Sequence, residues 1–195
     1  MRKILILTGL AISLVSVSLF AGDAAPKKKD PVVPRKASEF VFNMLGGPPQ
    51  LLSSYKGKTL VLAFMFTTCP HCQKTAQILS TVQTEYKAKG VQVLGAVFDQ
   101  AAVKNLPEFQ KKLGLNFPVG YSEQGPVLEF LQVPPTDPYF VPILVFVDKR
   151  GNVRSQYIGD ESFLQRQELN IRVEIDKMLG VGPGASAPAK ATPKS

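Results

Sequence analysis

The stretch TLVLAFMFTTCPHC, residues 59–72, joins an apolar run to two closely spaced cysteines. Apolar residues fill both faces of residues 59–66, which predicts a central strand covered on each side. After the cysteines, apolar residues recur at helical spacing and predict a helix from Pro70 to about Lys89. The cysteine pair therefore lies where a buried strand passes into the first turn of a helix.

Cys69 and Cys72 are the only cysteines of the 195-residue chain. The first turn of a helix has unpaired backbone N–H groups and the positive end of the macrodipole, and both favour a thiolate over a thiol. Pro70 suits the first helical position, where its missing N–H is not needed. Two thiols at this place predict a disulfide that closes and reopens during thiol–disulfide exchange.

Three other interpretations of the cysteines are weaker. A structural disulfide stabilises mainly by closing a long loop, and two intervening residues close almost none. A structural zinc site needs four N or S ligands, but the sequence offers only the two cysteines and His71, its single histidine. Inert buried thiols remain a third alternative, although they seldom fall at a junction between strand and helix.

Both ends of the chain differ from its middle. Residues 1–21 have a charged start followed by an apolar stretch at residues 4–21, which predicts a signal peptide or an N-terminal membrane anchor. Residues 22–38 are rich in charge and proline and predict a disordered linker, and residues 181–195 predict a disordered basic tail. One domain is expected at residues 39–180, outside the cytoplasm, in the periplasm or cell envelope, secreted or membrane-anchored.

The formal net charge of +8 lies mostly outside the predicted domain. Residues 39–180 contain 14 Lys and Arg against 13 Asp and Glu, a net charge of +1. A basic groove on the fold is therefore unsupported, and we expect no nucleic-acid partner.

The rest of the domain predicts an α/β fold. Residues 91–98 predict a second central strand, and the strand–helix–strand unit implies a right-handed parallel crossover. Residues 143–148 and 153–158 predict a hairpin around Gly151, followed by a last helix capped by Asp160 or Ser162. Shorter elements are expected as strands at residues 40–42 and 117–119 and as helices at residues 107–113 and 126–132.

The order of elements resembles the thioredoxin superfamily, and more narrowly its TlpA/ResA-type, redoxin branch. Three features carry the resemblance: Cys69-Pro70-His71-Cys72, Phe140-Val141-Pro142 before the hairpin, and the turn from Asp148 to Val153. It implies a three-layer fold with a central mixed sheet of about five strands flanked by helices. It also implies a thiol–disulfide oxidoreductase with no cofactor and no resident metal.

The resemblance also implies roles for residues near the cysteines. The Val141–Pro142 bond is expected to be cis and to face the disulfide. The backbone of Val141 would then be unpaired and could receive an extended peptide. A trans proline at an edge strand is the alternative. Cys69 is expected to be the nucleophile that forms a mixed disulfide with a protein partner, and Cys72 to resolve that mixed disulfide. His71 would stabilise the Cys69 thiolate or, alternatively, lie exposed without effect.

The direction of exchange is inferred from departures from the family pattern. The buried acid six residues before the first cysteine and its nearby lysine correspond to Ala63 and Gly95, and the ResA-type glutamate corresponds to Thr75. Thr68 replaces the usual Trp, so Pro70 and Thr68 are expected to be structural at the site. The Pro70-His71 dipeptide resembles DsbA-like oxidases. These features favour an oxidant or isomerase. We expect a membrane redox partner that resets the cysteines. A reductase in cytochrome c maturation is the alternative.

Two other functions remain as alternatives. A thiol peroxidase on a redoxin scaffold would need Pro and Thr where this chain has Leu62 and Phe66. A Cu(I)-handling module would suit two thiolates, but copper carriers of similar fold have three residues between the cysteines and a distant histidine. Thiol–disulfide exchange therefore stays the favoured function.

Overall fold

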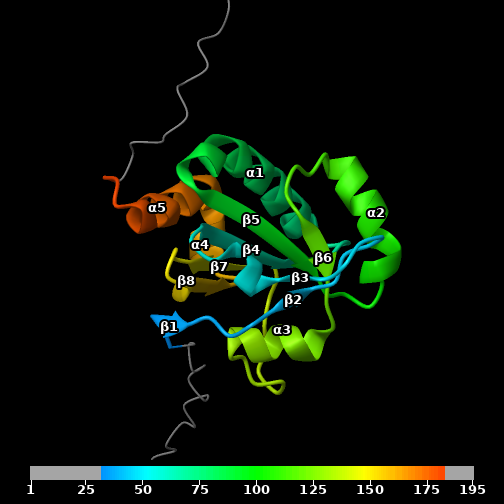
Figure 1. The fold of residues 1–195 in the computed structure, drawn as a ribbon. Helices are drawn as coiled ribbons and strands as arrows, with labels where there is room; N and C mark the ends of the chain where they lie inside the picture. The colour runs from blue at the N-terminus through cyan, green and yellow to red at the C-terminus, as the bar shows by residue number, and fades with distance from the viewer. Residues whose placement is uncertain (1–31, 183–195) are drawn as a thin grey trace, which may run out of the picture.

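A computed structural model describes residues 32–182, and a mixed six-stranded sheet runs through its middle (Figure 1). The strand order is β1-β8-β7-β4-β5-β6, and β2 and β3 form a separate two-stranded sheet. The elements are β1 (Arg35–Lys36), β2 (Val41–Phe42), β3 (Gln50–Leu51), η1 (Leu52–Tyr55), β4 (Thr59–Met65), α1 (Pro70–Tyr86), η2 (Lys87–Lys89), β5 (Val91–Val97), α2 (Ala102–Leu113), β6 (Val119–Tyr121), α3 (Gln124–Leu131), β7 (Ile143–Val147), β8 (Asn152–Ile158), α4 (Glu161–Gln165) and α5 (Gln167–Leu179).

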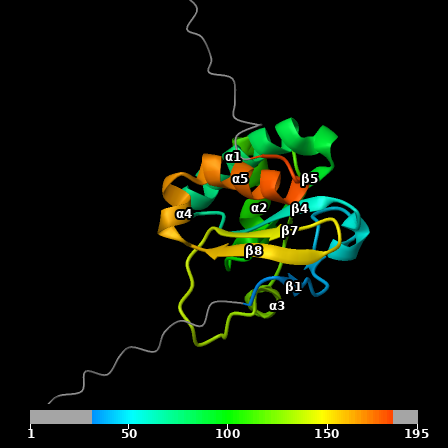
Figure 2. The same ribbon diagram turned by 90° about the vertical axis from the view of Figure 1, so that its left-hand side faces the viewer.

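The sheet separates two hydrophobic layers. Helices α1, α2, α4 and α5 cover one face, and α3 with the N-terminal segment covers the other (Figure 2). Every residue of β4 is buried, because this strand has β5 on one side, β7 on the other and helices on both faces. The three-layer α/β fold expected from the sequence is confirmed.

The ends of three strands meet at one edge of the sheet. β4 and β5 are parallel, so the loops that follow Met65 and Val97 leave at the same edge. β7 is antiparallel to β4, and Phe64 pairs with Ile143, so β7 begins where β4 ends. The cysteine motif after β4, the residues after β5 and the residues before β7 therefore converge.

The sheet has six strands rather than the expected five, because Arg35–Lys36 pair with β8. Arg35 donates hydrogen bonds to the Phe130 carbonyl (2.9 Å) and to Gln156 (2.8 Å). The predicted linker of residues 22–38 is thus wrong at its C-terminal end, where the chain joins the sheet. The predicted segment 1–21, most of the linker and the tail from residue 183 lie outside the described residues.

Two helices differ from the prediction. α2 begins at Ala102 instead of Pro107, so the proline lies inside the helix. Pro107 lacks the N–H that would bond the Val103 carbonyl. The helix tolerates this loss because Val103 is exposed to solvent. The expected single last helix is broken at Arg166 into α4 and α5. The Asn170 side chain donates to the Phe163 carbonyl (2.9 Å), which satisfies a carbonyl of α4 at the break.

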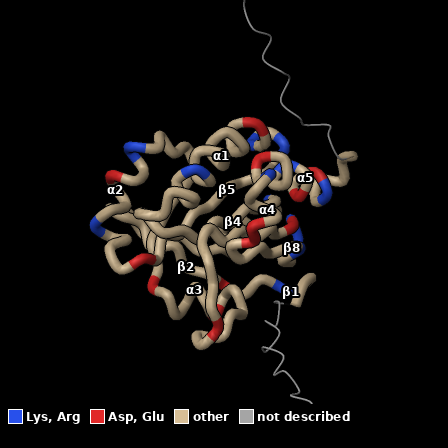
Figure 3. Tube along the Cα trace, turned by 180° about the vertical axis from the view of Figure 1, so that it is seen from behind, with Lys and Arg blue, Asp and Glu red and all other residues tan. Residues whose placement is uncertain are grey.

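Charges of both signs are interspersed over the described chain (Figure 3). This distribution agrees with the near-neutral domain counted from the sequence. Residues 32–182 include no helix that is both long enough and apolar enough to cross a membrane.

Candidate active site

Cys69 is the N-cap of α1, directly after the turn that leaves β4. Its Sγ accepts a hydrogen bond from the backbone N–H of Cys72 at 3.5 Å, as N-cap side chains do with the first turn of a helix. Pro70 occupies the first helical position. Cys69 is half-buried and its thiol is free, so the sulfur is placed at the electropositive end of α1 and is partly open to solvent.

Cys72 lies behind Cys69 and is fully buried. Its Sγ accepts a hydrogen bond from the backbone N–H of Phe66 at 3.5 Å. Burial raises the pKa of the Cys72 thiol strongly; the Phe66 N–H opposes this shift, whereas Cys69 and the charge of Asp99 add to it. The two sulfurs therefore differ in access, and burial makes the Cys72 thiol a weaker acid than an ordinary cysteine.

The three neighbouring residues predicted at the site are all exposed: Thr68, Pro70 and His71. Among residues 32–182, the His71 imidazole makes no hydrogen bond to either sulfur. The His71 backbone carbonyl accepts from the Thr75 hydroxyl at 2.9 Å, within α1.

Val141 and Pro142 lie at the edge of the sheet that carries the cysteines. Because Phe64 pairs with Ile143, Pro142 lies one position further along, beside the end of β4. The Val141–Pro142 bond is cis, as the resemblance implied. Pro142 is buried, Val141 is half-buried, and the backbone of Val141 makes no hydrogen bond within residues 32–182. The preceding residue, Phe140, is 69% exposed.

Ala63 and Gly95 occupy the positions where the family pattern has a buried acid and a nearby lysine. Ala63 on β4 pairs in register with Gly95 on β5. A Cβ at Gly95 would lie 3.1 Å from Val119 and 3.2 Å from Met65, so this region is packed with apolar atoms. Thr75, at the place of the ResA-type glutamate, is buried and donates to Gln167 at 2.7 Å.

Asp99 is a carboxylate near the site that the sequence interpretation missed. It follows β5 and accepts two hydrogen bonds from Thr67, one from the backbone N–H (2.7 Å) and one from the hydroxyl (2.8 Å). Its negative charge also acts on Cys72. The sequence did contain a signal: an acid directly after the strand parallel to the cysteine-bearing strand belongs at the same sheet edge.

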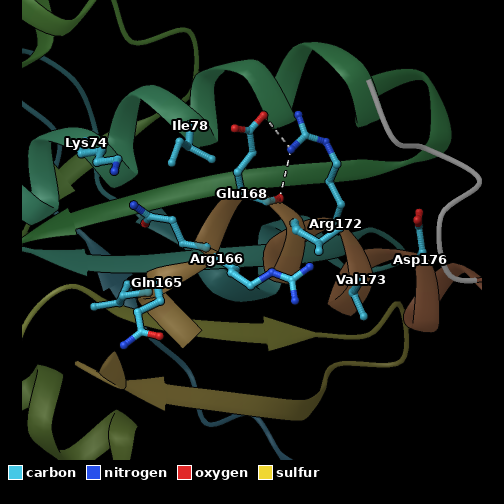
Figure 4. A pocket seen from close by; sticks show the side chains of 11 residues that line it. Lys74, Ile78, Gln165, Arg166, Glu168, Arg172, Val173 and Asp176 are labelled. Atoms are coloured by element: carbon cyan, nitrogen blue, oxygen red, sulfur yellow. Dashed lines mark hydrogen bonds and ion pairs between the residues drawn. The ribbon is translucent and has the colours of Figure 1, made fainter. Parts of the chain in front are cut away.

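A cavity of about 510 Å³ lies between α1 and the α4–α5 break (Figure 4). Lys74 and Ile78 of α1 border it, and neither cysteine does. Arg172 on its wall is buried and forms ion pairs with Glu85 (2.9 Å) and Glu168 (3.1 Å). These ion pairs compensate the charge of Arg172, whereas Lys74 and Arg166, which also line the cavity, form no ion pair within residues 32–182.

Within residues 32–182, no group of three or more His, Cys, Asp or Glu side chains is placed to hold a metal ion. The site as described is a pair of thiols with hydrogen-bonded surroundings. Thiol–disulfide exchange needs no further group.

The redoxin family model matches residues 21–170 of the chain. "Thiol-disulfide oxidoreductase ResA" of Bacillus thuringiensis (strain Al Hakam) is 32% identical over 161 residues, which cover 82% of this chain and 86% of the relative. The protein of the same name from Bacillus cereus (strain ATCC 10987 / NRS 248) is 30% identical over 167 residues, with 85% and 89% covered.

Solved structures show the same fold. A thiol:disulfide interchange protein of the thioredoxin family from Chlorobium tepidum TLS has a TM-score of 0.64 at 22% identity, with 77% of this chain and 99% of that chain covered. A secreted Mycobacterium tuberculosis disulfide oxidoreductase, homologous to E. coli DsbE, has a TM-score of 0.50 at 28% identity, with 60% and 81% covered.

Proposed function

The chain belongs to the redoxin family and is a thiol-disulfide oxidoreductase, and from this we propose that Cys69 and Cys72 perform its exchange reaction with protein clients. The observation that carries the proposal is the asymmetry of the two sulfurs. Cys69 is half-buried at a helix N-cap, whereas Cys72 is fully buried behind it. In such an arrangement the accessible sulfur can react with the client, and the buried sulfur can react only with the accessible one.

Cys69 is the nucleophile in this proposal. Its thiolate attacks a client disulfide, a mixed disulfide forms, and the other client sulfur leaves as a thiolate. Cys72 then attacks Cys69 Sγ, the Cys69–Cys72 bond forms, and the second client sulfur leaves. The same steps run in reverse when the Cys69–Cys72 disulfide oxidises a client dithiol.

The client would lie along Val141 and Pro142. The backbone N–H and C=O of Val141 are free of hydrogen bonds within the described residues, so they can pair with an extended peptide. The exposed Phe140 ring next to them offers an apolar contact for the client. Pro70 and Thr68 shape the turn, and His71 provides a hydrogen bond or positive charge toward the Cys69 thiolate, which stabilises the reduced form.

For the direction of exchange, we propose oxidation or isomerisation of clients. The apolar pairing of Ala63 with Gly95, and the buried Thr75 in place of a glutamate, leave these positions without the groups associated with a reductase. Reduction of clients, as in cytochrome c maturation, is the second candidate, and the relatives named ResA support it at least as well.

We propose that the protein works outside the cytoplasm. The charged start and apolar stretch of residues 1–21 support export, either with cleavage or as a membrane tether through residues 4–21. The similarity to a secreted disulfide oxidoreductase is in line with this location. A membrane redox partner would then restore the cysteines after each turnover.

Serine variants test the roles of the two sulfurs. With a client that carries a disulfide, Cys72→Ser should accumulate a mixed disulfide, whereas Cys69→Ser should form none. The adduct is measured by mass spectrometry before and after a reductant is added. A Cys69→Ser protein that still turns over the client would refute the proposed nucleophile.

Equilibration with glutathione redox buffers tests the direction. A reduction potential above about −180 mV supports oxidation or isomerisation, and a value near about −270 mV supports reduction.

A further inference from the structure

The turn between β4 and α1 is tied to the end of β5 by one side chain, Asp99. The two oxygens of its carboxylate accept from the Thr67 N–H at 2.7 Å and from the Thr67 hydroxyl at 2.8 Å. Charge-assisted hydrogen bonds of this length are among the stronger ones in proteins. Asp99 is itself half-buried, so water competes for these bonds less than on an open surface.

Thr67 is also held by two other side chains. Gln73 of α1 donates to its carbonyl at 3.0 Å, and Asn105 of α2 donates to its hydroxyl oxygen at 3.2 Å. Thr67 is only 5% exposed, and both its N–H and its C=O are bonded to side chains. The peptide groups on both sides of Thr67 are therefore fixed by Asp99 and Gln73, and its hydroxyl is fixed by Asp99 and Asn105.

The residue before Thr67 contacts both redox positions. The Phe66 N–H donates to Cys72 Sγ at 3.5 Å, and the Phe66 carbonyl accepts from the Cys69 N–H at 3.3 Å. A shift of Thr67 would move Phe66 and alter both contacts. Asp99 thus acts on the sulfurs through two consecutive residues of the turn.

We infer that Asp99 is a positioning residue for the exchange reaction, which holds the Phe66–Cys69 turn so that Cys72 can attack Cys69. The inference rests on the proposed roles of the two cysteines. The affected step is the resolving one: Cys72 loses its proton to solvent, its thiolate attacks Cys69 Sγ in the mixed disulfide, and the client thiolate leaves. This step joins two sulfurs of one chain, so its rate depends on how well the turn fixes their geometry.

The negative charge of Asp99 predicts an effect on the rate of the resolving step that is opposite to the effect of positioning. A carboxylate near Cys72 disfavours its thiolate, so loss of the charge alone would speed the resolving step. Loss of positioning would slow it. The sign of the rate change therefore separates the two roles.

An aromatic disulfide reagent that releases one coloured thiolate per exchange resolves the two steps. With the reduced protein, the first release reports the attack by Cys69, and the second, independent of reagent concentration, reports the attack by Cys72. Asp99→Ala should slow the second release about tenfold and change the first by less than about twofold. Asp99→Asn keeps an acceptor for the Thr67 N–H and should give a smaller slowing.

Asp148→Ala is the matched control. Asp148 also accepts hydrogen bonds in a turn, here from the backbone N–H groups of Arg150 (2.9 Å) and Asn152 (3.0 Å), but it lies at the opposite end of the sheet. It should leave both releases unchanged. A second release that is unchanged or faster in Asp99→Ala, or equally slow in Asp148→Ala, would overturn the inference.

Thr67 variants provide an independent test if Asp99→Ala fails to fold. Thr67→Val removes the hydroxyl donor at nearly constant shape and should slow the second release, whereas Thr67→Ser keeps that donor and should restore the rate. Equal rates in these two variants would contradict the inference. If the second release of the wild-type protein persists in Cys72→Ser, the proposed function itself fails. This result differs from the one that refutes only the inference, in which Asp99→Ala gives the second release at the wild-type rate.

Discussion

Cys69 and Cys72 are separated by two residues but have different surroundings. Cys69 Sγ faces the helix N-terminus, while Cys72 has no exposed surface and meets the Phe66 N–H. Low access protects Cys72 from reagents in solution, yet a mixed disulfide on Cys69 lies next to it. Burial thus directs Cys72 toward an intramolecular reaction.

The pH dependence of the resolving step follows from the Cys72 thiol. Its pKa is raised by burial, and Cys69 and Asp99 raise it further, so at any neutral pH the thiolate fraction is below that of an ordinary cysteine. The thiolate fraction then grows about tenfold per pH unit throughout the range below the pKa. The second thiolate release, followed by stopped flow from pH 6 to pH 9, should rise without a plateau. A plateau near about pH 8.5 would indicate an ordinary thiol.

Thr75 shows how one buried hydroxyl ties α1 to α5. Thr75→Val removes the 2.7 Å hydrogen bond to Gln167 and leaves a buried amide oxygen without its donor, which should cost about 1–3 kcal/mol of unfolding free energy. Thr81→Val is the control, because Thr81 is an exposed threonine of the same helix. It should change stability by less than about 0.5 kcal/mol in denaturant titrations. Equal losses in both variants would contradict a special role for Thr75.

At this scale, the sequence identified the residues that are close neighbours in the chain. The position of Cys69 at a helix N-terminus follows from the change of hydrophobic period and from Pro70, and both are local signals. Asp99 was missed because its contact with Thr67 joins residues from two loops, and only the parallel pairing of β4 and β5 brings them together. The difference in burial between the two cysteines likewise depends on packing across the sheet.

At the scale of elements, the long apolar strands were predictable and the short segments were not. β4, β5, α1 and the β7–β8 hairpin have strong periodic patterns or turn residues, and the structure contains all of them. β1 has only two residues, and its pairing with β8 depends on tertiary contacts of Arg35. The sequence predicts a helix start at Pro107, but the segment from Ala102 packs Leu106 and Phe109 into the core and is helical despite the proline.

The contact between the end of β8 and the loop before β7 depends on Gly159. A Cβ there would lie 2.3 Å from Phe140 Cβ, and the φ of +53° is left-handed. Gly159→Ala should therefore displace Phe140 and cost about 1–3 kcal/mol beyond the backbone penalty. Gly114→Ala isolates that penalty, because Gly114 has a similar φ of +58° with open space around it.

The same pair of variants tests client binding. Displacing Phe140 should slow exchange with a protein client more than exchange with a small aromatic disulfide, whereas Gly114→Ala should affect neither. Stability is read from denaturant titrations and exchange from the two substrates. If Gly159→Ala and Gly114→Ala have equal stability, the close approach to Phe140 does not matter.

At the scale of the whole molecule, the redox state of one bond is coupled to the stability of the fold. Two hydrophobic layers pack on opposite faces of the sheet, and Cys72 belongs to the layer under α1. The loop closed by a Cys69–Cys72 disulfide is very short, so the cross-link itself adds little to stability through chain entropy. A stability difference between the two redox forms therefore reports how well the folded site accommodates dithiol or disulfide.

This coupling gives a second measure of the direction of exchange. A strongly oxidising site has a reduced form that is stabilised by the fold, and each 30 mV between folded and unfolded chains corresponds to about 1.4 kcal/mol. If the protein oxidises or isomerises its clients, the reduced protein should unfold at a higher denaturant concentration than the oxidised protein. The Cys72→Ser variant, which cannot form the bond, should unfold at the same concentration under both conditions. An oxidised form that is the more stable of the two would instead favour reduction of clients, because the folded protein would then give up its electrons readily.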